Sequence, residues 1–180
     1  YIDGGVSISR TARVFPTYLI FKPAMFITAF FLIQYWRFNS DLMGKISSYL
    51  HYKKIFLFFG IGSAIFLILH SIFIGIKIDN DFYKLFRRVL ILVFIIFEVI
   101  AQTILVINFY KIKKQIRNFI NSKILNFKIC LVLILIFVAI VSLPFITATG
   151  YTRLKHALEW NYFVGVISFY LLTFFFWKKQ

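Results

Sequence analysis

Acidic residues are scarce in this chain: six Asp and Glu stand against 21 Lys and Arg among 180 residues, a formal net charge of +15. On a soluble protein, such a basic excess would suggest nucleic-acid binding. Here the basic residues lie in short segments between apolar runs, which is typical of membrane proteins. No aromatic-basic module or zinc spacing accompanies the charge, so no nucleic acid is expected as a partner.

Cysteine and the motifs of common catalytic sites are equally sparse. Cys130 is the only cysteine and lies in an apolar run, which excludes an intrachain disulfide and a cysteine-based metal site. The three histidines are scattered, and the sequence contains no HExxH helix, GxSxG elbow or glycine-rich phosphate loop. We therefore expect no metal and no cofactor, and the sequence does not identify an enzyme.

Apolar residues are what the chain has in abundance. Hydrophobic side chains make up 61% of it, and the mean hydropathy is +0.86. Five apolar runs, each about 18–22 residues long, can each cross a hydrocarbon core of about 30 Å as a helix. The runs are 18–35, 55–76, 89–110, 129–147 and 158–177. The sequence predicts an all-α integral membrane protein, a bundle of five transmembrane helices in a single domain 1–180. Because residue 1 is Tyr, we expect a sixth helix upstream.

The distribution of Lys and Arg predicts the orientation of these spans. The N-terminal segment and the segments 77–88 and 148–157 carry eight such residues, whereas the segments on the opposite side carry twelve. The richer side should be cytoplasmic. This places the C-terminus in the cytoplasm and Tyr1 on the other side, in the plasma membrane or an endomembrane.

Polar and aromatic residues in or next to the spans gather on the expected non-cytoplasmic side. They are Ser9, Arg10, Arg13, Lys22, His70, His156, Glu159 and Trp160. One interpretation is a pocket for a lipid headgroup, in which a basic side chain binds phosphate. His156 and Glu159, the candidates for catalysis, would then move protons.

A structural interpretation of the same residues is also open. Lys22 would extend its ammonium to the interface, and His70 would hydrogen-bond to a neighbouring helix. Glu159 would pair with Arg153 or Lys155, which precede it by two turns or fewer.

Glu98 is the buried charge of the sequence, near the middle of the third run. It must be neutral, paired across helices, or next to a wet cavity. Lys22 or His70 could be its partner. A structural interhelical hydrogen bond is favoured over a proton relay.

Two segments resemble a known family. Residues 7–16 read Ser-Ile-Ser-Arg-Thr-Ala-Arg-Val-Phe-Pro before a span ending in Tyr-Trp-Arg-Phe, and residues 156–160 read His-Ala-Leu-Glu-Trp. Together they resemble the FRAG, DRAM and Sfk family of polytopic membrane proteins, which includes autophagy modulators and GPI-anchor remodelling proteins. Ser9, Pro16, Glu159 and Trp160 match by position. The family's Asp-x-Gly after Ile-Ser is replaced by Arg-Thr-Ala, so no role of a loop acid is carried over.

The resemblance implies that the chain handles or remodels membrane lipids, of GPI-anchor or phospholipid type, through a polar pocket on the non-cytoplasmic side. Its partners would be membrane lipids and other membrane proteins. A structural or assembly subunit of a larger membrane complex is the alternative. A small transporter that uses Glu98 is the third hypothesis.

Overall fold

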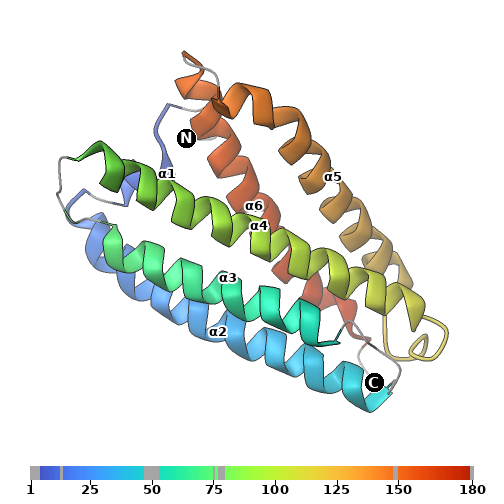
Figure 1. Cartoon of the computed structure of the whole chain (residues 1–180). Coiled ribbons are helices and arrows are strands. Elements are labelled where there is room, and N and C mark those ends of the chain that lie inside the picture. The colour runs from blue at the N-terminus through green and yellow to red at the C-terminus, as the bar shows by residue number, and fades with distance from the viewer. Residues whose placement is uncertain are drawn as a thin grey trace. The chain divides into compact units, whose positions relative to one another are not determined.

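The computed structural model describes residues 5–12, 14–46, 53–74, 76, 80–147 and 150–178 (Figure 1). Its helices are α1 (Ile8–Thr11), α2 (Thr17–Ile46), α3 (Lys53–Phe73), α4 (Asp81–Lys111), α5 (Ser122–Thr147) and α6 (Thr152–Phe176). All except α1 are long and apolar enough to cross a membrane. The predicted all-α membrane protein with five visible spans is confirmed.

Each of the five long helices begins before the apolar run that predicts it, although α3 ends at Phe73 rather than at 76. Helix α4 begins at Asp81 rather than at 89, and α5 begins at Ser122 rather than at 129. Lys128, which the sequence places in a basic loop, therefore belongs to a membrane-spanning helix. Hydropathy marks the part of a helix that lies in hydrocarbon, and it leaves out the polar turns at the interface.

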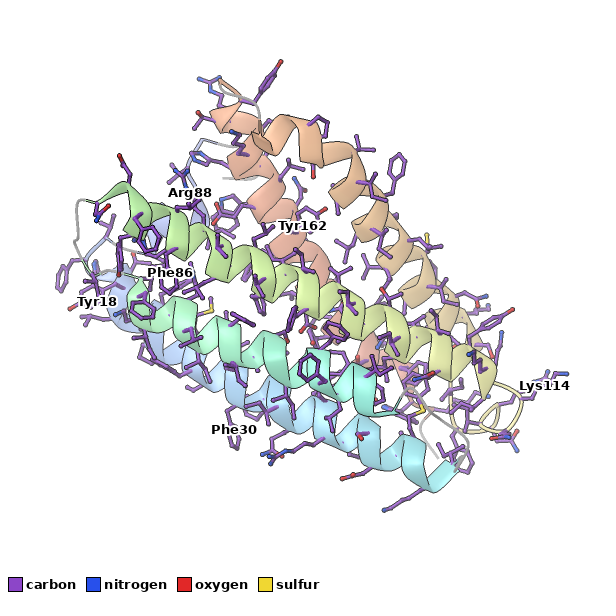
Figure 2. The ribbon with its side chains drawn as sticks, viewed as in Figure 1. Tyr18, Phe30, Phe86, Arg88, Lys114 and Tyr162 are labelled. Atoms are coloured by element: carbon purple, nitrogen blue, oxygen red, sulfur yellow. The ribbon has the colours of Figure 1, made fainter. Side chains whose placement is uncertain are left out.

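Large apolar side chains cover the outside of the helices. Phe174 is 79% exposed, Ile20 73% and Phe137 67%. Figure 2 shows Phe30 pointing away from α2 in the same manner. A soluble protein does not expose this much contiguous apolar surface. Hydrocarbon is the solvent that these faces fit.

The chain divides into two compact units. One comprises Ile8–Ala101, with α1, α2, α3 and most of α4. The other comprises Tyr1–Ser7 and Gln102–Gln180, with the end of α4, α5 and α6. We call them the N-terminal unit and the C-terminal unit.

Small residues of α3 set the packing of the N-terminal unit. The indole of Trp36 on α2 lies over Gly60, where a Cβ would be 2.4 Å from the ring. Phe97 on α4 lies over Gly62, where a Cβ would be 2.7 Å from its ring. The two glycines thus admit one aromatic ring from each neighbouring helix. Small residues in a membrane helix allow neighbouring helices to approach this closely.

In the C-terminal unit, α5 packs against α6. A Cβ on Gly165 would lie 2.6 Å from Cδ2 of Leu135, and the Tyr162 hydroxyl donates to the Leu135 carbonyl at 3.2 Å. The end of α6 is tied to the loop before α5, since the Asn121 amide donates to the Phe176 carbonyl at 2.8 Å. The α5–α6 pair is therefore fixed both midway and at this end.

Candidate functional site

The start of α6 carries three of the sequence-predicted site residues. His156, Glu159 and Trp160 lie in the first turns of the helix, and all three are partly buried. Spacings of three and four residues place side chains on one helix face. His156 and Glu159 are therefore neighbours, and Lys155, also partly buried, precedes Glu159 by one turn. A cation, an imidazole and a carboxylate thus share this end of α6.

Trp160 joins this end of α6 to the beginning of the chain. Its indole Nε1 donates a 2.8 Å hydrogen bond to the carbonyl of Val6. The next residue, Ser7, is only 7% exposed. The bond brings the segment before α1 against α6 inside the C-terminal unit. The bond therefore ties Trp160, in the second segment of the family resemblance, to the residue that directly precedes the first segment.

The structure does not describe the side chains of the predicted site residues that precede α2. Ser9 and Arg10 belong to α1, with side chains outside the described part of the chain. Arg13 lies outside the described residues altogether. Their predicted role in headgroup binding stays a prediction.

Lys22 and His70 lie in the N-terminal unit. Lys22 Nζ is 3.4 Å from the carbonyl of Ile72 at the end of α3, a long hydrogen bond. His70, also on α3, is 7% exposed and lies close to Arg87 of α4. Arg87 in turn lies over the ring of Tyr83, whose hydroxyl donates to the Phe73 carbonyl at 2.7 Å. Arg87 is a cation near the end of α3 that the sequence reasoning did not single out as a site residue.

Glu98 is fully buried on α4 and is bound from α3. The Ser63 hydroxyl lies 2.7 Å from Oε2 of Glu98 and 2.8 Å from the Gly60 carbonyl, so it links the carboxyl group to the backbone of α3. This is the interhelical hydrogen bond that the sequence favours. The partner in this bond is Ser63, whereas the sequence suggests Lys22 or His70.

Lys128 forms a buried site that the sequence reasoning missed. The residue is 2% exposed on α5, and its Nζ donates to Thr173 Oγ1 of α6 at 2.6 Å. The same Nζ lies 4.1 Å from the ring centroid of Phe169 and 5.3 Å from that of Phe176. We call these two rings and Thr173 the Lys128 cage. Cation–π contacts of this length stabilise a desolvated ammonium.

An apolar groove lies between the end of α4 and the first half of α5. It measures about 590 Å³, within the range typical of small-molecule sites. Its lining residues are Thr103, Val106, Ile107, Tyr110, Lys111, Ile129, Val132, Leu133 and Ile136. The groove belongs to the C-terminal unit, as does the start of α6, but it lies toward the other end of α5.

Among the described residues, no three His, Cys, Asp or Glu side chains are grouped so that they could hold a metal ion. The chemistry available at the start of α6 is instead hydrogen bonding, charge pairing and proton exchange by Lys155, His156 and Glu159. Comparisons with protein-family models, with curated proteins and with solved structures found no match to this chain.

Proposed function

We propose that this membrane protein binds membrane lipids and handles or remodels them, with the headgroup at the start of α6. The observation that carries the proposal is the hydrogen bond from Trp160 to the Val6 carbonyl. It holds the segment before α1 beside a helix end that bears Lys155, His156 and Glu159. A lipid headgroup offers phosphate and hydroxyl groups, and these are the groups that such side chains bind.

Each residue has a distinct role in this proposal. Lys155 and the amide groups of the first turn of α6 attract the phosphate, since a helix N-terminus is positive. Glu159 accepts hydrogen bonds from headgroup hydroxyl or amine groups. His156 exchanges protons with them if the lipid is remodelled. Trp160 positions the N-terminal segment.

Other parts of the proposal rest on the sequence. Ser9, Arg10, Arg13, Lys22 and His70 are expected to add to headgroup binding. The GPI-anchor or phospholipid class of the lipid comes from the family resemblance, as does the non-cytoplasmic side.

The test is lipid retention by the purified full chain, measured by native mass spectrometry after titration with a phospholipid and with a glycosylphosphatidylinositol. Glu159→Gln should lower retention. Asn161→Gln is the matched control, because Asn161 is exposed two residues away and its amide bonds its own helix at Ala157. Equal retention by the wild type and Glu159→Gln would reject the headgroup role.

A second arm concerns Trp160. Trp160→Phe keeps the ring but removes the donor to Val6, so amide hydrogen exchange around residues 5–8 should become faster and lipid retention should fall. Recovery of the chain only within a stable complex, with no effect of Glu159→Gln on lipid content, would favour the structural-subunit alternative.

A further inference from the structure

The groove between α4 and α5 has a buried floor and exposed rims. Val106 is 4% exposed and Val132 3%, and they form the floor. Tyr110, 59% exposed, and Leu133, 60% exposed, form opposite rims. The groove is therefore accessible from the surroundings of the helices, which are hydrocarbon for most of its length.

The charge at one end of this groove has a single sign. Lys111 lines the groove at the last residue of α4. Lys113 follows, with its ammonium 6.0 Å from the ring centroid of the rim residue Tyr110. The segment 111–128 contains six basic residues and no acidic one. Figure 2 shows Lys114 pointing outward from the loop in this segment.

We propose that the groove binds one acyl chain of an anionic phospholipid, whose phosphate lies against Lys111 and Lys113. Two observations select this occupant. Most of the lining side chains are aliphatic, as an acyl chain requires, and the cations Lys111 and Lys113 lie at one end of the groove. Basic pockets between transmembrane helices recognise anionic headgroups in this way. The charge distribution predicts this face to be cytoplasmic, where anionic lipids are concentrated.

This site is independent of the proposed headgroup site at the start of α6. The groove is lined by α4 and α5, whereas the headgroup site is on α6, and they share no residue. Failure of either proposal leaves the other standing, since one depends on Glu159 and the other on Lys111 and Leu133.

The experiment compares phosphatidylglycerol with phosphatidylcholine carrying the same acyl chains, titrated onto the purified full chain and followed by native mass spectrometry. We expect phosphatidylglycerol to be retained more strongly. Lys111→Gln should reduce this preference about fivefold, the effect of one cation near an anionic lipid. Leu133→Trp fills the groove and should remove the retained phosphatidylglycerol. Ile134→Trp is its control, because Ile134 is 52% exposed on the same helix and does not line the groove.

The altered residues are exposed at the surface, so the variants should fold, and a thermal unfolding scan of each verifies this. Equal retention of both lipids would overturn the proposal. So would unchanged retention in Leu133→Trp, or an equal loss in Ile134→Trp. If Leu133→Trp changes the oligomeric state and not the lipid content, the groove is an interface between copies and the proposal fails.

Discussion

Lys128 and Thr173 connect α5 to α6 through a 2.6 Å hydrogen bond from Nζ to Oγ1. Lys128 is 2% exposed, and burial of a cation is unfavourable unless partners replace its water. The Lys128 cage supplies them: one hydroxyl and the faces of Phe169 and Phe176. The pair therefore adds a polar contact to an interface that is otherwise built largely from apolar side chains.

The first prediction concerns the coupling between these two residues. Lys128→Met keeps most of the side-chain volume, and Thr173→Val keeps its shape, so each removes the hydrogen bond without a cavity. A double-mutant cycle on the free energy of unfolding in mixed micelles should give a coupling of about 1 kcal/mol. A second cycle, in which Lys123→Met takes the place of Lys128→Met, provides the comparison. Lys123 is an exposed residue of α5, so Lys123→Met should be additive with Thr173→Val. Additivity at Lys128 as well would contradict the role of the bond.

A second prediction concerns Ser63 and Glu98 in the N-terminal unit. Ser63→Ala removes the hydroxyl that lies 2.7 Å from the Glu98 carboxyl group, in a fully buried setting. A buried polar group that loses a partner destabilises a protein by about 1–3 kcal/mol. Thermal unfolding in detergent should show this loss.

The control for Ser63 is on the same helix. Ser71 is also fully buried, but its hydroxyl donates only to the Leu67 carbonyl of α3 itself. Ser71→Ala should therefore destabilise the protein less than Ser63→Ala. If the two variants unfold alike, the interhelical bond adds nothing beyond a local one.

Gly60 gives the third prediction. A methyl group there would lie 2.4 Å from the rigid indole of Trp36, which has no room to move because it is fully buried. Gly60→Ala should destabilise the protein by about 1–3 kcal/mol, as overpacking does. In the double variant with Trp36→Leu, which removes the ring, the added loss from Gly60→Ala should be smaller. A loss of the same size in both backgrounds would show that the strain does not come from this contact.

The membrane spans and the packing of α3 could be predicted from the sequence because both are local patterns. Long apolar runs must become helices in hydrocarbon, where every backbone polar group needs a partner. Four of the five residues from Gly60 to Ala64 are small, and this alone indicates close approach of neighbouring helices.

Lys128 was missed, although a local signal existed. Leu125, Lys128, Val132 and Leu135 follow helical spacing, and all four are buried. Leu125 and Lys128 precede the apolar run that begins at 129. Because that run predicts a loop before it, the charge of Lys128 indicates only topology there, and the helical pattern is not apparent.

The bond between Trp160 and Val6 could not be foreseen from either residue alone. The two are 154 residues apart, and the acceptor is a backbone carbonyl, which leaves no mark in the sequence. The groove between α4 and α5 likewise depends on the spacing of two helices. Such features require tertiary structure.

The last prediction concerns orientation, on which the two lipid proposals depend for their leaflet. The excess of Lys and Arg predicts that the 112–121 loop is cytoplasmic and that the start of α6 is not. In a Cys130→Ser background, a cysteine introduced at the exposed Asn118 should be shielded from an impermeant thiol reagent in sealed cells, whereas one at the exposed Thr152 should react. Both should react after permeabilisation, which shows that each thiol is accessible. The reverse pattern in sealed cells would invert the topology, because Asn118 and Thr152 lie at opposite ends of α5 and α6. The headgroup site would then face the cytoplasm, and the anionic-lipid groove would face the leaflet that is poorer in anionic lipids.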